Sequence, residues 1–270
     1  MFQERIVSFF YLKIFFLVII VIVIGSLSFR IGNEVLESSF KNNSFSLLYV
    51  AKDSKIIFVD KADSSTYFLS IGDVRSFVKG KSALEASIAL GIPLNGMIVE
   101  DNAPGNINDF ISTKNVFRLI FSGEPPYFKN MDKYDVYKLA NAIGNTTNDN
   151  RHEVKVNIFD QEDLKAKVGD GFKDSEINNT PLTIEIDNGT SVNGLGNDLA
   201  LILGREGYNI ISVKTSSVNS GSFIAYPNEN NSLVSSLQGL TGFPIKKQSV
   251  SQSADITIFL GEDLDAMLSP

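Results

Sequence analysis

The sequence contains no cysteine and only one histidine, His152. A disulfide scaffold, a zinc site built from cysteine and histidine, a thiol nucleophile and an iron–sulfur cluster are therefore excluded. Basic residues are in the minority, because 24 lysines and arginines stand against 31 aspartates and glutamates, which gives a net charge of −7. This negative charge opposes binding to a nucleic acid, which is itself a polyanion.

Apolar residues, in contrast, are abundant, at 43% of the 270 positions. This fraction is enough for a packed core and excludes disorder as a description of the whole chain. Because most domains have about 100–150 residues, the length predicts one large domain or two ordinary ones.

A long apolar run extends from Leu12 to Phe29, and Lys13 is its only charged residue. A helix of this length rises about 27 Å, close to the ~30 Å of a bilayer's hydrocarbon core. We therefore predict one transmembrane helix. Arg5 and Lys13 before the run outnumber Arg30 after it, which predicts a cytoplasmic N-terminus and extracytoplasmic C-terminal domains. A cleaved signal peptide, with Ser26-Leu27-Ser28 as its small-x-small site, is the alternative.

The fold class that we predict is α/β, with the transmembrane helix followed by two α/β ectodomains. Two polar loops could separate the domains, Asn145 to Asn150 and Gly169 to Pro181. The second is the better domain boundary, because it combines glycine, charge and a proline. The predicted parts are an anchor at 1–30, a stalk at 31–45, a first domain at 46–168, a linker at 169–181, a second domain at 182–263 and a tail at 264–270.

Apolar periodicity predicts the elements of the first ectodomain. They are strands at 45–51, 55–60, 66–71, 97–100 and 153–159, helices at 82–90 and 133–143, and a further element at 115–122. Gly91 stands where the helix at 82–90 should stop.

The second ectodomain is predicted as a small sandwich in the order strand, helix, strand, strand, helix, strand. Its strands are at 182–187, 209–214, 221–226 and 255–260, and its second helix is at 231–240. One face of its first helix carries Val192, Leu195, Leu199, Ile202 and Leu203, and Gly207 ends that helix. The nearly all-apolar run at 255–260 is typical of a buried inner strand.

The loop Asn193-Gly194-Leu195-Gly196 stands between a predicted strand and a predicted helix, where backbone amides can bind phosphate. A dinucleotide-binding loop needs glycine or alanine three residues after Gly196, and Leu199 stands there. We therefore interpret this loop as a tight turn that lets the helix pack closely on the strand.

Other polar residues that could carry chemistry have simpler interpretations. His152 lacks marked carboxylate partners, so we interpret it as a surface histidine. Glu262, Asp263 and Asp265 could supply oxygen ligands to a divalent cation or could form a solvated chain end, and we favour the second interpretation.

Residues 182–263 resemble the LytR C-terminal domain in a set of short motifs. These are Asn188-Gly189-Thr190, Gly194-Leu195, Gly207-Tyr208, Ile224-Ala225-Tyr226 and Leu260-Gly261-Glu262-Asp263. The resemblance implies a bacterial envelope protein, because this domain often follows a membrane anchor and a LytR-CpsA-Psr catalytic domain. That catalytic domain moves glycopolymers from a polyprenyl carrier onto peptidoglycan.

The middle of the chain resembles a shortened, degenerate LytR-CpsA-Psr domain in the runs Phe68 to Asp73 and Ala86 to Glu100. Gly72 stands near the place of the family's arginine, and Arg75 follows three residues later. The family's arginine-rich stretch that grips pyrophosphate is missing. Because two phosphates in a partly dry site need several fixed cations or a metal, these departures predict a loss of transferase activity.

The resulting hypothesis is a non-catalytic, membrane-anchored bacterial cell-envelope protein that binds or scaffolds cell-wall assembly, with no catalytic residue, cofactor or metal. Its partners would be the membrane and a cell-wall polymer or an envelope protein. The alternative is a reduced glycopolymer transferase that uses Asp73, Arg75 and Mg²⁺ on a polyprenyl-pyrophosphate-linked polymer. A third hypothesis is a general ligand-binding ectodomain whose resemblance extends only to the fold.

Overall fold

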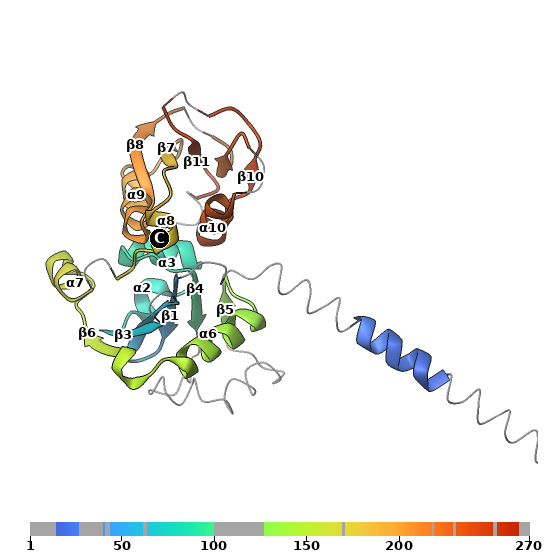
Figure 1. Cartoon of the computed structure of the whole chain (residues 1–270). Coiled ribbons are helices and arrows are strands. Elements are labelled where there is room, and N and C mark those ends of the chain that lie inside the picture. Colours follow the sequence, from blue (N-terminus) through green and yellow to red (C-terminus); the bar gives the residue numbers. More distant parts are fainter. Residues whose placement is uncertain are drawn as a thin grey trace, which may run out of the picture. The chain divides into compact units, whose positions relative to one another are not determined.

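The computed structural model describes residues 15–26, 40, 44–61, 64–99, 127–168, 171–217, 219–228, 231–250 and 253–264. The chain divides into a unit of residues 1–38 and a compact unit of residues 39–270. The compact unit holds all the strands of the described residues (Figure 1). The element that the sequence predicts at 115–122 lies outside the described residues.

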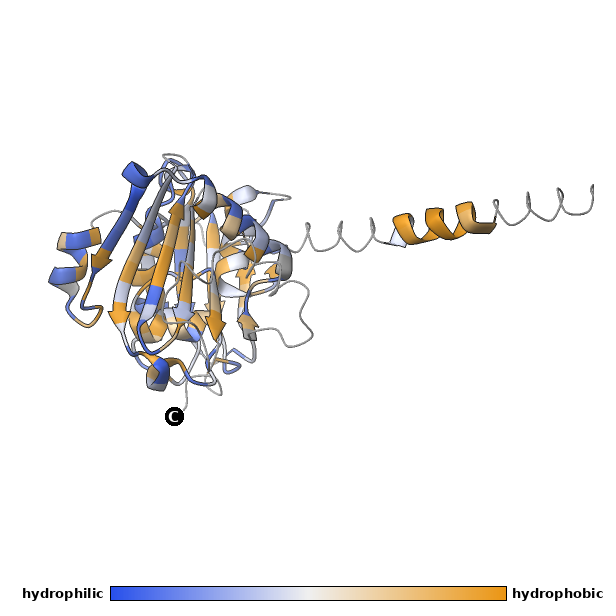
Figure 2. Cartoon of the chain, turned by 90° about the horizontal axis from the view of Figure 1, so that it is seen from below, coloured by the Kyte–Doolittle hydropathy of each residue, from blue (hydrophilic) through white to orange (hydrophobic). Residues whose placement is uncertain are grey.

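The first unit contains a helix at residues 15–26, within the predicted membrane span. Every residue from Phe15 to Ile24 is a large apolar residue with an exposed side chain. Figure 2 shows the hydrophobic colour along most of this helix. Within the described ranges, none of the helices combines the length and apolar character that crossing a bilayer requires. Residues 12–14 and 27–29 of the predicted span lie outside those ranges, so the transmembrane helix stays a prediction.

The first sheet has six strands among the described residues, in the order β5-β4-β1-β2-β3-β6. The strands are β1 (Ser44–Val50), β2 (Ser54–Asp60), β3 (Ser65–Gly72), β4 (Gly96–Val99), β5 (Tyr127–Lys129) and β6 (Arg151–Lys155). The sheet is mixed, because β4 and β6 run parallel to the neighbours β1 and β3, whereas the other pairs are antiparallel.

Strand β1 is buried along its whole length because it lies inside this sheet and both faces are covered. Leu47 and Tyr49 face one core together with Leu139 and Ile143 of helix α6 (Lys133–Asn145). Leu48 and Val50 point to the opposite face and join a core under α2 (Arg75–Val78), α3 (Ala83–Leu90) and α7 (Gln161–Val168). Figure 1 shows α6 on one side of the sheet and α2 and α3 on the other.

The predicted strand at 153–159 is too long, because β6 ends at Lys155. The side chain of Asn157 accepts a hydrogen bond from the backbone of Phe159, which turns the chain. Asp160 then accepts from the backbone amides of Glu162 and Asp163 and thereby caps helix α7, an element that the periodicity did not predict.

The second sheet has the order β10-β9-β11-β7-β8 in the described part of the chain. Its strands are β7 (Thr183–Asn188), β8 (Asn209–Thr215), β9 (Phe223–Ala225), β10 (Ile245–Lys246) and β11 (Ile256–Leu260). Strand β11 lies between β9 and β7, which confirms the prediction of an inner strand. The helices are α8 (Ser175–Asn178), α9 (Leu195–Glu206) and α10 (Ser232–Thr241). Helix α9 begins at Leu195, so Val192 packs on the core from the preceding turn rather than from the helix.

Helix α3 contributes to two cores. Its start is capped reciprocally by Ser82 and Glu85. Its end is capped by Gly91 in the left-handed conformation, at the position where the sequence predicts that the helix stops. Leu90 packs in the core of the first sheet, whereas Leu84 packs among the residues of α9, α10 and the second sheet. We call residues 44–168 the first half and residues 171–264 the second half. Leu84 therefore ties the two halves together.

Replacing Leu84 by alanine should lower the free energy of unfolding by about 2–5 kcal/mol, because a 7% exposed side chain is removed from a packed core. Hydrogen exchange should become faster in α9 and α10 as well as in α3. The control is Leu201→Ala, which removes a 46% exposed leucine from α9 and should change stability by less than about 0.5 kcal/mol. Faster exchange confined to α3 would show that Leu84 does not support the second half.

Candidate binding pocket

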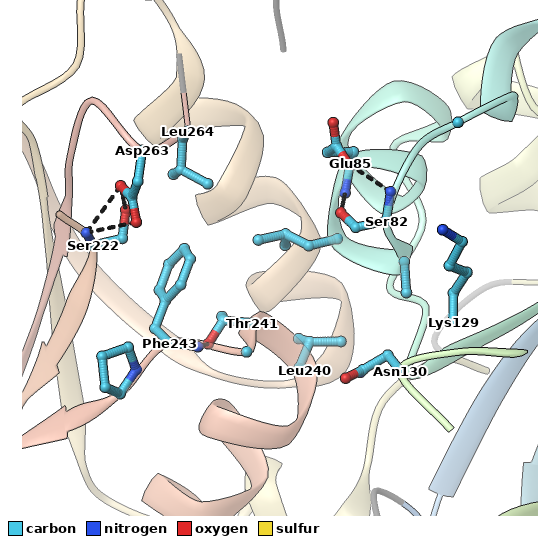
Figure 3. A pocket seen from close by; sticks show the side chains of 15 residues that line it. Ser82, Glu85, Lys129, Asn130, Ser222, Leu240, Thr241, Phe243, Asp263 and Leu264 are labelled. Atoms are coloured by element: carbon cyan, nitrogen blue, oxygen red, sulfur yellow. Dashed lines mark hydrogen bonds between the residues drawn. The ribbon is translucent and has the colours of Figure 1, made fainter. Parts of the chain in front are cut away.

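A pocket of about 440 Å³ is lined by residues from both halves (Figure 3). The first half contributes residues 80 and 82–85 around the start of α3 and residues 129–130 at the end of β5. The second half contributes residue 222 before β9, residues 240–244 at the end of α10, and residues 263–264. The volume lies in the range of about 300–1,000 Å³ that is typical of small-ligand sites.

The floor of the pocket is apolar. Leu84, Leu240, Phe243 and Leu264 line it, and each is at most 7% exposed. Gly242 ends α10 in the left-handed conformation, with φ of 75°, and this turn brings Phe243 back toward the core. The floor is therefore a continuation of the core of the second half.

Asp263 forms an acidic wall of the pocket, and its carboxylate is held by Ser222. The backbone amide of Ser222 donates to both carboxylate oxygens at 3.0 Å, and its hydroxyl donates to Oδ1 at 2.7 Å. The backbone amide of Gly261 donates in turn to that hydroxyl at 3.0 Å. A Cβ atom on Gly261 would lie 2.5 Å from the backbone of Gly221, so only glycine permits this close approach.

The opposite wall carries Lys129, from the end of β5 (Figure 3). The neighbouring Asn130 fixes this wall, because its side-chain amide donates to the carbonyl oxygens of Asn95 at 2.8 Å and Gly239 at 2.7 Å. These two acceptors belong to different halves.

The Glu85 carboxylate also lines the pocket, but it is buried and accepts a hydrogen bond from the backbone amide of Ser82. The pocket thus combines an apolar floor with Asp263 on one wall and Lys129 on the other, an arrangement suited to binding.

A buried polar cluster lies where the two halves meet. Asn95 accepts from the backbone amide of Ser46 at 2.7 Å and donates to Oε1 of Glu206 at 3.3 Å. The Asp174 carboxylate accepts from the backbone amide of Ser44 at 2.8 Å and from its hydroxyl at 3.0 Å. The backbone amide of Asp174 donates to the Glu206 carbonyl oxygen at 2.9 Å. These bonds link β1 to the ends of α8 and α9.

Glu206 is the unusual member of this cluster, because its Oε2 is buried with no hydrogen-bond partner in the described structure. Burial raises the pKa of Glu206 from its ordinary value of 4.5 to about 7, and the nearby Asp174 charge adds to the rise, while the hydrogen bond from Asn95 opposes it. The pKa of the neighbouring Tyr208 hydroxyl is also raised well above its ordinary value, chiefly by burial. The surroundings of Glu206 in this buried polar cluster therefore favour its protonated form.

The pair Asp73 and Arg75 lies outside the pocket lining. Strand β3 ends at Gly72, so Asp73 lies after the strand and Arg75 begins helix α2. The Arg75 guanidinium donates to both Asp73 carboxylate oxygens, at 2.9 and 2.6 Å. These hydrogen bonds lower the pKa of Asp73 to about 2. Both side chains are about half exposed, at 45% and 52%, so the structure shows a surface ion pair.

The other polar motifs have structural surroundings. His152 stacks on Tyr67, with the ring centroids 4.7 Å apart. Gly194 precedes α9 in the left-handed conformation, and a Cβ atom on Gly196 would lie 2.8 Å from Val213 Cγ1. This contact fits a turn with close packing of helix on strand. Among the described residues no three histidine, aspartate or glutamate side chains are grouped to hold a metal ion, and Asp265 lies outside them.

Sequence reasoning missed Lys129, Phe243 and Ser222 as site residues. The pocket forms only when α3, β5 and α10 meet, and no local spacing encodes that meeting. The local signals for Asp263, which lines the pocket wall, were the resemblance motif that it ends and the acidic group of Glu262, Asp263 and Asp265.

The Glu206 environment generates a pH prediction. The folded state binds the proton of Glu206 more tightly than the unfolded state, so the free energy of unfolding should fall as pH rises from 4.5 through about 7. Glu206→Gln should remove this fall and be more stable than the wild type at pH 8, by about 3 kcal/mol. Urea unfolding between pH 4 and about 8.5 measures both. Glu153→Gln, at an exposed position on β6, is the control and should leave the profile unchanged. Parallel profiles for the wild type and Glu206→Gln would contradict the prediction.

Comparison with known proteins agrees with the sequence resemblance. The family model described as LytR cell envelope-related transcriptional attenuator matches residues 181–264, which is less than half of the chain. Searches of the curated proteins and of the solved structures give no match. The likeness of the middle of the chain to a LytR-CpsA-Psr domain stays a prediction, since the family match begins at residue 181. The chain therefore contains, at residues 181–264, a LytR C-terminal domain that includes β7 to β11 and the acidic wall of the pocket.

Proposed function

We propose that the chain is a non-catalytic bacterial envelope protein that binds cell-wall material in the pocket between α3 and α10. The observation that carries this proposal is the pocket itself, which has an apolar floor and oppositely charged walls and takes half of its lining from the LytR C-terminal domain. Such a cavity offers shape and charge for recognition.

The anchor is supported by the exposed apolar residues at 15–24, which have no core to pack against in the described structure. In water, a contiguous apolar surface of this kind is unfavourable, and a bilayer removes the penalty. We therefore propose that residues 12–29 hold the compact unit at the outer side of the cytoplasmic membrane.

The lack of catalysis is supported by the electrostatics of Asp73 and Arg75. Asp73 is ionised at neutral pH and accepts two hydrogen bonds from Arg75, so the pair has no net charge. Its attraction for a pyrophosphate is therefore weak, because the carboxylate repels the ligand that the guanidinium attracts. A transferase would have to break this pair or add a metal ion.

The proposed topology predicts the result of protease protection. Protease added to intact spheroplasts should digest residues 31–270 and leave the anchor, because the compact unit faces outward. A cytoplasmic protein in the same sample serves as the control and should stay intact. Full protection of the chain, or a mature N-terminus near Phe29, would contradict the proposed anchor.

The binding proposal predicts sedimentation with cell-wall sacculi. The full-length chain in detergent should sediment with purified sacculi, and Lys129→Trp should weaken binding at least about tenfold, because an indole on β5 occupies the pocket. The matched control is Lys155→Trp on β6, an exposed strand position outside the pocket lining, which should bind like the wild type.

Equal binding by both variants would contradict the pocket as the binding site. The same preparation should leave a polyprenyl-pyrophosphate substrate unchanged when Mg²⁺ is present. Turnover that depends on Mg²⁺ and is lost in a folded Asp73→Ala variant would instead establish the transferase alternative.

A further inference from the structure

The pocket lining carries the carboxylates of Asp263 and Glu85 and the ammonium group of Lys129 (Figure 3). Glu85 is buried and accepts a hydrogen bond from the backbone amide of Ser82, whereas Asp263 and Lys129 lie on opposite walls. Among the described residues neither side chain takes part in an ion pair. Two unlike charges that are kept apart across a cavity, rather than neutralised by one another, are available to groups of a ligand.

The acidic wall is held in place by hydrogen bonds, and the Asp263 carboxylate can still accept a hydrogen bond from a ligand. Ser222 donates three hydrogen bonds to the Asp263 carboxylate, which offers about four acceptor positions in total. The backbone behind it is fixed by the close approach of Gly261 to Gly221. Asp263 is nevertheless exposed, so a ligand ammonium can reach it without rearranging the loop.

The basic wall offers hydrogen-bond donors and a positive charge, whereas the acidic wall offers acceptors and a negative charge. Lys129 ends β5, which pairs with β4 opposite Met97, and its ammonium group carries three donors. Asn130 holds this strand end to Asn95 and to Gly239 of α10, so the distance between the two walls is set by hydrogen bonds across the two halves. An ammonium group forms strong, charge-assisted hydrogen bonds with a carboxylate.

The floor between the walls is mainly apolar, and the hydroxyl group of Thr241, which also lines the pocket, is already bonded to the backbone of Leu237 and Phe243. Leu84, Leu240, Phe243 and Leu264 are buried and apolar, and they offer contacts for methyl or larger aliphatic groups. The hydroxyl groups of a neutral glycan would lose hydrogen bonds to water over this floor, at a cost for each unpaired group. The floor thus favours aliphatic side chains over sugar rings.

We infer that the pocket recognises short peptides that carry a free ammonium group and a free carboxylate with aliphatic side chains between them. The inference rests on the proposed function and assigns wall recognition to the peptide part of the cell wall rather than to its glycan strands. Asp263 binds the ammonium group, Lys129 binds the carboxylate, and the four apolar residues of the floor contact the side chains.

The test is isothermal titration calorimetry of the full-length chain in detergent with four probes. These are a tripeptide of alanine, leucine and alanine with free ends, its N-acetylated form, its C-amidated form, and chitotetraose. The free tripeptide should bind at least about tenfold more tightly than either blocked form, because each block removes one charge contact. Chitotetraose should show no binding.

Two variants test which end of the peptide each wall binds. Lys129→Met should lose the discrimination against the amidated peptide and keep the discrimination against the acetylated one. Asp263→Asn keeps an oxygen that accepts from Ser222 and should show the opposite pattern. Lys155→Met is the control and should behave like the wild type, and thermal unfolding of each variant verifies the fold.

Equal affinity for the free and blocked peptides, or chitotetraose binding that Lys129→Met leaves unchanged, would overturn the inference. Retained sedimentation with sacculi in either case would show that the proposed function stands and that the ligand class is wrong. Loss of sacculus binding by the wild type would overturn the proposed function itself.

Discussion

The sharing of helix α3 between two hydrophobic cores is the constraint on which the rest of the structure depends. Leu90 packs under the first sheet and Leu84 packs under the second, so the helix cannot move with one half alone. The Arg205 guanidinium adds a hydrogen bond from α9 to the carbonyl oxygen of Gly91, directly after α3. Because the pocket lies at the start of α3, its width follows from how this helix is held.

The buried polar cluster where the two halves meet has a physical role different from that of the apolar contacts of α3. Asn95, Asp174 and Glu206 join the halves through directional bonds, which specify one docking arrangement more strictly than apolar contact does. The cost is a buried carboxyl group with one unpartnered oxygen, and protonation reduces that cost. The same polar cluster therefore makes the stability of the junction between the two halves depend on pH near neutrality.

Much of the fold follows from local sequence patterns. The alternation of apolar residues predicted β1, β2 and β3, and Gly91 and Gly207 marked the ends of α3 and α9. The match of the family model to residues 181–264 agrees with the set of turns and strand ends that the sequence shows. These features are local, so a single sequence carries enough information to place them.

Other features depend on contacts between distant segments. The short strand β5 exists because β4 pairs with it, and α7 begins because Asp160 caps it after the turn at Asn157. Neither has a strong apolar period. The candidate site was equally hidden, because Lys129 and Asp263 are 134 positions apart and meet the same cavity only through the packing of α3. Asp73 and Arg75 are only two positions apart, so the sequence made this pair easier to notice. The structure shows that they form a surface ion pair.

The central claim is that the pocket between the two halves binds cell-wall material, and hydrogen exchange on the full-length chain with and without a soluble cell-wall digest tests it most directly. Binding in the pocket should slow exchange in the segments at 80–85, 129–130, 240–244 and 261–264, which line or adjoin the pocket in both halves. Slowed exchange at residues 73–78 around the Asp73 and Arg75 pair, with no change in those four segments, would contradict the account.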